Sequence, residues 1–170
     1  TIIKETDTTE IVEENEEEHE VEIVNEYLAS LLTANPDTVG WLKVNNTNID
    51  YPVVQTHDNK KYLDYNYNNE EDRDGWIFMD YRNDSVELSK NTIIYGHGRL
   101  DSIMFGTLKN ILKDNWLKKP DNHIIKLSTE NENTLWQVFS VYRIPTTNDY
   151  IQVSFINDKE FTTFGEMLIG

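Results

Sequence analysis

The sequence predicts a mostly β protein, a barrel or sandwich of mainly antiparallel strands, with an N-terminal helical segment and short peripheral helices. After Pro36, short runs of β-branched and aromatic residues recur along the chain, and turn residues such as Asn45-Asn46 and Asp74-Gly75 separate them. Helical spacing is confined to the N-terminus and to short stretches. With 170 residues, 38% of them hydrophobic, the chain is long enough to bury one sizeable core.

Residues 1–34 differ in composition from the rest of the chain. After a polar tail, a helix is predicted from about Glu10, with an apolar stripe that includes Tyr27 and Leu31. The helix is expected to end before Pro36, because a residue that precedes proline avoids helical geometry. The first 30 residues contain 11 acids and one base, which accounts for most of the net charge of -16. We interpret this run as the solvated face of an amphipathic helix; a surface for a metal or a basic partner is the alternative.

The remainder, residues 35–170, is expected to form one β-barrel domain. Its strands are predicted where β-forming residues lie between turn signals: Trp41–Val44, Asn48–Gln55, Trp76–Asp80, Thr92–Tyr95, His123–Ser128, Leu135–Ile144 and Tyr150–Phe155. Its helices are predicted at Asn59–Leu63, Ser102–Leu112, Lys113–Trp116 and, capped by Asp158, Lys159–Ile169. Most aromatic residues, Trp136 and Phe139 among them, are predicted for the core.

Composition excludes several classes of function. The chain has no cysteine, which rules out disulfides, thiolate zinc sites and a thiol nucleophile within these residues. No stretch reaches the roughly 18–20 consecutive apolar residues of a membrane helix, and the acidic balance argues against nucleic-acid binding. The glycines form no phosphate-binding loop and the four histidines lack the spacing of metal ligands, so we expect no cofactor and no metal.

His97 is the leading candidate for chemistry. It follows the predicted strand Thr92–Tyr95 and is flanked by Gly96 and Gly98, which places an imidazole where the backbone can approach a ligand. Such a histidine suits general acid–base catalysis, because imidazoles ordinarily titrate near neutral pH. A structural turn histidine is the alternative.

Other polar residues give weaker indications. Ser102 and Ser128 are candidate nucleophiles, but neither lies in a Gly-x-Ser-x-Gly turn, and ordinary surface serines are the simpler interpretation. Asp80, Asp84 and Asp101 are candidates either to orient an imidazole or to cap turns.

Several ordered segments resemble class B sortases. They are Asn35–Leu42 (NPDTVGWL), Asn48–Gln55 (NIDYPVVQ), Gly75–Asn83 (GWIFMDYRN), Asn91–His97 (NTIIYGH), Met104-Phe105, Val138–Tyr142 (VFSVY) and Asn148–Ile151 (NDYI). Each segment is weak alone, but the ordered set is specific, above all Tyr-Gly-His together with Asp-Tyr-Arg-Asn. The resemblance covers about residues 20 to 170.

The resemblance implies a membrane-anchored cysteine transpeptidase on the outer face of Gram-positive cells, with an eight-stranded barrel. Such enzymes cleave a C-terminal sorting motif, in class B typically of the Asn-Pro-x-Thr type, through a thioacyl intermediate, and join the surface protein to an amine of the cell-wall peptide. The implied partners are therefore a sorting-motif peptide and a peptidoglycan amine. His97 matches the catalytic histidine. The positions that match the sorting-motif groove, or lie beside the histidine, are Asn59, Leu63, Tyr95, Tyr150 and Ile151.

The sequence departs from the class B pattern on its C-terminal side. The family's Thr-Leu-x-Thr-Cys strand and the arginine of the next strand lie beyond the helix that begins near Asp158, whereas this chain stops at Gly170. We therefore expect a barrel truncated before its last strands and a chain that is inactive by itself. The start at Thr1, without a signal peptide, leads us to expect the membrane anchor upstream.

Three accounts follow from these observations. The favoured one is a sortase whose C-terminal part lies outside this sequence, because a barrel without its last strands exposes edges and core. The second is a non-catalytic relative that binds peptides. The third is an unrelated extracellular β-barrel binding module.

Overall fold

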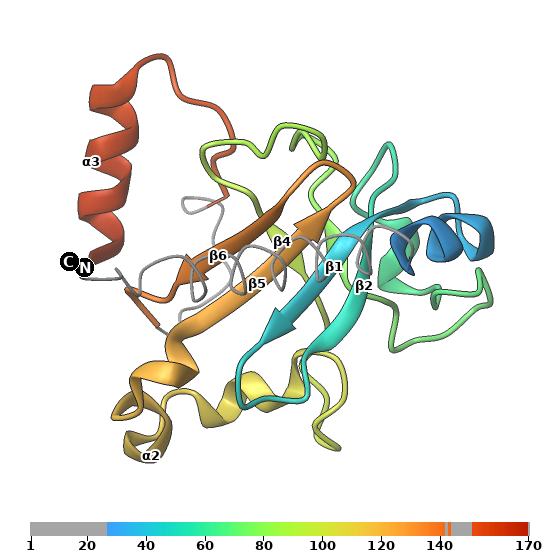
Figure 1. Cartoon of the computed structure of the whole chain (residues 1–170), viewed down its shortest axis with the longest axis horizontal. Helices are drawn as coiled ribbons and strands as arrows, with labels where there is room; N and C mark the ends of the chain where they lie inside the picture. Colours follow the sequence, from blue (N-terminus) through green and yellow to red (C-terminus); the bar gives the residue numbers. More distant parts are fainter. Residues whose placement is uncertain (1–26, 142, 144–150, 170) are drawn as a thin grey trace, which may run out of the picture.

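The computed structural model describes residues 27–141, 143 and 151–169. Figure 1 shows a curled sheet with short helices around it. Residues 27–34 are helical, and the helix ends where predicted, since the Asn35 amide bonds to the Leu31 carbonyl at 2.8 Å and Pro36 follows. The acidic run of the N-terminal segment lies outside the described residues.

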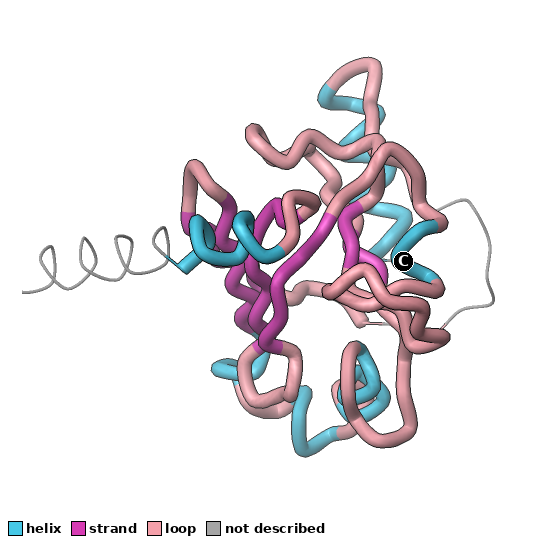
Figure 2. The backbone as a smooth tube through the Cα atoms, turned by 90° about the vertical axis from the view of Figure 1, so that its right-hand side faces the viewer, coloured by secondary structure: helices cyan, strands magenta, loops and turns pink. Residues whose placement is uncertain are grey.

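Six strands form one sheet in the order β4-β3-β2-β1-β5-β6. They are β1 (Thr38–Val44), β2 (Asp50–Val54), β3 (Phe78–Met79), β4 (Ile94–Tyr95), β5 (Ile124–Thr129) and β6 (Asn133–Gln137). β2 and β3 run parallel, and the other neighbouring pairs are antiparallel. The strands lie in the middle of the molecule, with loops and helices outside them (Figure 2). This half-barrel confirms the mostly β prediction.

The described helices of the domain are short, as predicted. They are the 3₁₀ helices η1 (Lys61–Leu63), η2 (Phe105–Asn110) and η3 (Pro120–His123), and the α-helices α2 (Asp114–Leu117) and α3 (Asp158–Ile169). The predicted helix Ser102–Leu112 begins late because Ser102 and Met104 have φ angles of 70° and 50°, which a right-handed helix does not accommodate. Within the described residues, no helix is long and apolar enough to cross a membrane.

The predicted strand Tyr150–Phe155 is wrong over residues 151–155, which form no strand; Tyr150 itself lies outside the described residues. The carbonyls of Ile151 and Gln152 accept hydrogen bonds from loop side chains instead of from a neighbouring strand. The predicted strand Leu135–Ile144 is too long, because β6 ends at Gln137.

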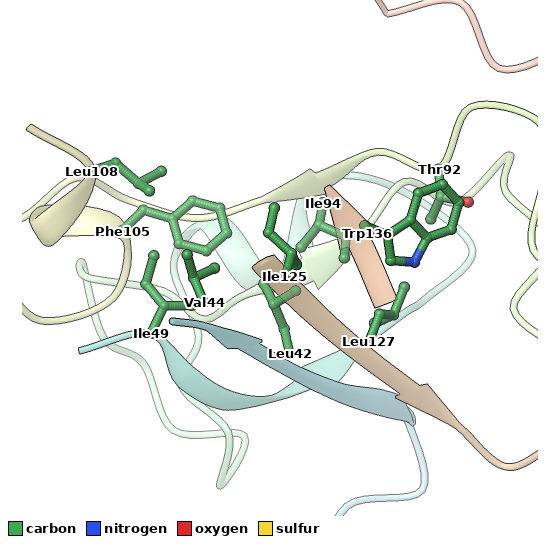
Figure 3. A pocket seen from close by; sticks show the side chains of 10 residues that line it. All are labelled: Leu42, Val44, Ile49, Thr92, Ile94, Phe105, Leu108, Ile125, Leu127 and Trp136. Atoms are coloured by element: carbon green, nitrogen blue, oxygen red, sulfur yellow. The ribbon is translucent and has the colours of Figure 1, made fainter. Parts of the chain in front are cut away.

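The core is packed around β1, β2 and β3. Four of its side chains, Ile49, Val53, Ile77 and Met79, are at most 1% exposed. An apolar cavity of about 310 Å³ adjoins it. In Figure 3, Phe105 lies toward one end of this cavity and Trp136 toward the other. None of the residues that line the cavity is charged, so it offers no acid–base chemistry.

The outer strand β6 is poorly covered. Leu135 and Trp136 are 71% and 42% exposed, and Phe139, which follows the strand, is 69% exposed. The prediction that Trp136 and Phe139 belong to the core is therefore wrong.

Candidate active site

His97 lies just beyond the end of β4, in a loop held against η2. Gly96 permits this approach, since a Cβ atom there would lie 2.9 Å from the Phe105 ring. The Phe105 amide donates to the His97 carbonyl at 3.0 Å, and Gly98 forms an antiparallel bridge with Met104. The strand-end position predicted from the sequence is thus observed, while the role of the histidine stays a prediction.

One hydrogen bond fixes the half-buried ring of His97. Its Nδ1 lies 3.0 Å from the backbone carbonyl oxygen of Asp74. Because a carbonyl only accepts, Nδ1 carries a proton, which leaves Nε2 as the nitrogen that can exchange a proton with a bound group. An imidazole held in this way can act as a general acid or base.

The orienting group was not evident in the sequence. Three carboxylates were candidates to orient the His97 ring, and each has another partner. Asp84 accepts from the Val86 amide at 2.8 Å, Asp101 pairs with Arg99, and Asp80 pairs with Arg82. The group that holds His97 is the Asp74 backbone carbonyl, and a backbone carbonyl leaves no signature in a sequence.

Asn59 and Tyr95 meet at the carboxylate of Asp80, which has no exposed surface. Asn59 Nδ2 and the Tyr95 hydroxyl donate to the same oxygen, Oδ2, at 2.9 and 2.8 Å. Burial and the hydrogen bond to the ionised carboxylate raise the pKa of Tyr95 to about 12, so its hydroxyl stays a donor at physiological pH.

Arg82 keeps Asp80 ionised and extends this network to Ile151. Burial by itself raises the pKa of Asp80, but the hydrogen bonds from Arg82 and its neighbours outweigh burial and hold the pKa well below its usual range. Arg82 Nε and Nη2 each donate to the carboxylate at 2.8 Å. Nη2 also donates to the Ile151 carbonyl at 3.1 Å, so the segment around Ile151 lies beside the groups that Asp80 holds.

The Leu63 backbone lies against the turn that holds His97. It ends η1 and is 39% exposed. Its carbonyl faces Gly75, where a Cβ atom would lie 2.8 Å from that oxygen and φ is 57°, so the position requires glycine. Because Gly75 follows Asp74, whose carbonyl binds His97, this turn contacts both predicted site residues.

An open cavity of about 560 Å³ adjoins the His97 loop and is lined in part by Gly96, Gly98, Arg99 and Arg143. It is large enough for a small ligand or part of a peptide. The described ranges contain no group of three side chains suited to hold a metal ion. The arrangement therefore offers proton transfer at His97 beside a polar network, and a nucleophilic thiol is not among its residues.

A sortase-domain family model matches residues 42–164, so the chain is a member of the sortase family. Sortase B of Staphylococcus aureus is 38% identical over 143 residues, which cover 84% of this chain and 58% of that protein. Sortase B of Listeria monocytogenes is 39% identical over 141 residues, which cover 83% of this chain and 56% of that protein. The chain belongs to the sortase B family, and it spans little more than half the length of these two relatives.

Solved structures agree with this assignment. A Staphylococcus aureus sortase B–substrate complex matches with a TM-score of 0.80 and 36% identity, over 86% of this chain and 67% of that one. A sortase B complexed with triglycine matches with a TM-score of 0.80 and 32% identity, over 96% of this chain and 79% of that one. The unrelated binding module considered from the sequence is therefore ruled out.

Proposed function

We propose that this chain is the peptide-binding and acid–base part of a class B sortase transpeptidase. The observation that carries the proposal is the fixed ring of His97, whose Nδ1 bond to the Asp74 carbonyl at 3.0 Å leaves Nε2 for proton transfer. Membership of the sortase B family supports the choice of reaction.

In the proposed reaction, a cysteine thiolate attacks the threonine carbonyl of an Asn-Pro-x-Thr type motif, and the peptide C–N bond after the threonine breaks. His97, as imidazolium, gives its Nε2 proton to the leaving amine, and a thioacyl intermediate remains. An incoming amine attacks this thioester, His97 takes up the proton, and the thiolate leaves. Since none of the 170 residues is a cysteine, we expect no transpeptidation by this chain alone.

The proposed peptide groove is lined by Asn59, Leu63, Tyr95, Tyr150 and Ile151. Among the described members, Asn59 and Tyr95 share one oxygen of Asp80, and the Arg82 side chain joins that carboxylate to the Ile151 carbonyl. This proximity supports a single groove. The substrate complex of a relative supports peptide binding on this fold.

We propose a peptidoglycan amine as the acceptor, supported by the triglycine complex of a related sortase B. The proposed location is the outer face of the cell membrane, where an anchored sortase meets both the sorting motif and the cell-wall peptide. Family membership supports this location.

A non-catalytic relative that binds the sorting motif is the second candidate, and it differs from the first in having no cysteine for the covalent step. Intact mass of the protein isolated from its own cells separates the two candidates. A longer species that contains a cysteine supports the transpeptidase, whereas a native chain without cysteine supports the binding protein.

Peptide binding tests the function common to both candidates. A fluorescent Asn-Pro-x-Thr peptide is titrated against the chain, with the scrambled peptide as control, and mass spectrometry follows cleavage. We expect preference for the ordered motif, weaker binding in Asn59→Ala and Leu63→Ala, and no cleaved product. Equal binding of both peptides removes the sorting motif as ligand, and cleavage by the cysteine-free chain contradicts the thiol mechanism.

A further inference from the structure

Asp80-Tyr81-Arg82-Asn83, here called the 80–83 turn, contains side chains that the proposed mechanism leaves unused. The turn follows β3 directly. Asp80 is 0% and Asn83 5% exposed. Buried polar side chains are costly unless their hydrogen bonds are satisfied, so their partners indicate what the turn holds in place.

The Asp80 carboxylate accepts five hydrogen bonds. Oδ1 accepts from the Arg82 amide at 3.0 Å and from Arg82 Nε at 2.8 Å. Oδ2 accepts from Arg82 Nη2, Asn59 Nδ2 and the Tyr95 hydroxyl at 2.8, 2.9 and 2.8 Å. Asn59 comes from the loop before η1 and Tyr95 from strand β4, and this one oxygen fixes their relative positions.

Arg82 carries the same constraint to a distant part of the chain. Its Nη2 donates to Asp80 Oδ2 and also, at 3.1 Å, to the carbonyl of Ile151, 69 residues away in sequence. A planar guanidinium presents several donors in a fixed fork, so one arginine can hold a carboxylate and a third group together. A lysine ammonium has no such fork.

Asn83 adds a second, parallel connection. Its Nδ2 donates to the Asn91 carbonyl at 2.8 Å, and its Oδ1 accepts from the Ile93 amide at 2.9 Å. Asn91 Nδ2 in turn donates to the Gln152 carbonyl at 2.7 Å. The carbonyls of Ile151 and Gln152 are therefore both bonded to side chains that the 80–83 turn orients.

We propose that the Asp80–Arg82 ion pair positions the peptide groove, holding one side chain from a loop, one from strand β4 and the backbone at Ile151 in one arrangement. The inference rests on the proposed function, which supplies the groove. The alternative is that the pair only stabilises the fold. Buried ion pairs contribute little to stability compared with apolar packing, whereas the bonds of this pair connect segments that are far apart in sequence.

Arg82→Lys separates positioning from stability. Lysine keeps a positive charge beside Asp80, so the buried carboxylate stays compensated, but it cannot reproduce the fork that reaches the Ile151 carbonyl. Arg82→Gln removes the charge as well. Lys43→Gln is the control, because it breaks an ion pair with Asp50 between β1 and β2.

Three measurements are made on each variant of the full chain: ¹⁵N order parameters of residues 152 and 153, affinity for the fluorescent Asn-Pro-x-Thr peptide, and the thermal unfolding midpoint. In Arg82→Lys we expect the order parameters to fall from about 0.85 to below about 0.6. Peptide affinity should weaken about 3- to 10-fold, as for the loss of one hydrogen bond. The midpoint should stay within about 3 °C of wild type.

Arg82→Gln should lower the order parameters as much as Arg82→Lys does and should also unfold at a lower temperature. The control Lys43→Gln should change neither the order parameters nor the peptide affinity.

Unchanged order parameters in both Arg82 variants overturn the inference, and so does lost order with unchanged peptide affinity. A midpoint that falls as far in Arg82→Lys as in Arg82→Gln assigns the pair to stability alone and also overturns it. If the wild-type chain binds no peptide, the proposed function fails, and the order parameters still decide whether the pair holds Ile151.

Discussion

The two edges of the sheet are stabilised by different kinds of contact. At the β3–β4 edge, directional hydrogen bonds dominate, and the fully buried Asp80 accepts five of them. At the β5–β6 edge, the buried contact is apolar: Leu127 of β5 is 4% exposed within the core, whereas the outer side chains Leu135 and Phe139 are 71% and 69% exposed. Directional bonds fix where each polar atom lies, whereas apolar contacts depend mainly on buried area. The candidate functional groups accordingly gather at the polar edge.

Replacing a buried leucine at the β5–β6 edge by alanine should give the largest loss of stability. The same replacement of an exposed leucine should have little effect. Leu127 of β5 is 4% exposed and Leu135 of β6 is 71% exposed. We expect Leu127→Ala to lower the free energy of unfolding by about 3–4 kcal/mol, and Leu135→Ala by less than about 0.5 kcal/mol. Urea denaturation measures both. Equal losses would contradict the contrast between the two strands.

Breaking the Asp80 network at the β3–β4 edge should lower the free energy of unfolding slightly less than Leu127→Ala does. Asp80→Asn keeps the shape of the side chain but leaves Arg82 without its counter-ion, and we expect a loss of about 3 kcal/mol, the low end for a broken buried pair. The low end applies because the Arg82 side chain is 37% exposed and can be hydrated. Asp101→Asn, at an exposed ion pair, should cost less than about 1 kcal/mol. A loss at Asp80 no larger than at Asp101 would refute the special role of the buried carboxylate.

The polar edge should also be sensitive to acid. The pKa of Asp80 is held below its ordinary 3.8 because hydrogen bonds from Arg82, Tyr95 and Asn59 outweigh burial. Its contribution to stability is therefore present above about pH 4 and is lost as the pH falls toward the folded-state pKa. We expect the stability difference between wild type and Asp80→Asn to narrow by more than about 1 kcal/mol between pH 5 and pH 2.

Denaturation curves at several pH values measure this narrowing. The other acidic groups titrate in both proteins, including Asp101, whose pKa the Arg99 guanidinium lowers to about 2. The difference between the two proteins therefore isolates Asp80. Parallel pH profiles would show that Asp80 is not the acid-sensitive group.

Local patterns predicted the regular parts of the fold. His123–Ser128 was predicted as a strand and β5 covers Ile124–Thr129, because alternating apolar residues pair directly with β1. The segment after Tyr150 was mistaken for a strand because its composition is β-forming, whereas its backbone bonds to Arg82 and Asn91. Contacts over such separations leave no local signal.

For the site, as for the fold, the local position of a residue was predictable and its long-range contacts were not. The Gly-His-Gly pattern placed His97 at a strand end, where the structure has it. The bond to the Asp74 carbonyl and the convergence of Asn59 and Tyr95 on Asp80 were not predicted. Both depend on how loops pack against each other and against β4, which neither residue type nor spacing specifies.

Cleavage of a fluorogenic Asn-Pro-x-Thr peptide by the cysteine-containing form of the protein, with and without His97→Ala, tests the proposed role of His97 most directly. The predicted result is a loss of turnover of at least about 100-fold. The free energy of unfolding should change by less than about 1 kcal/mol, because the half-buried ring makes a single hydrogen bond. Turnover retained in the folded His97→Ala variant would contradict the assignment of His97 as the acid–base group.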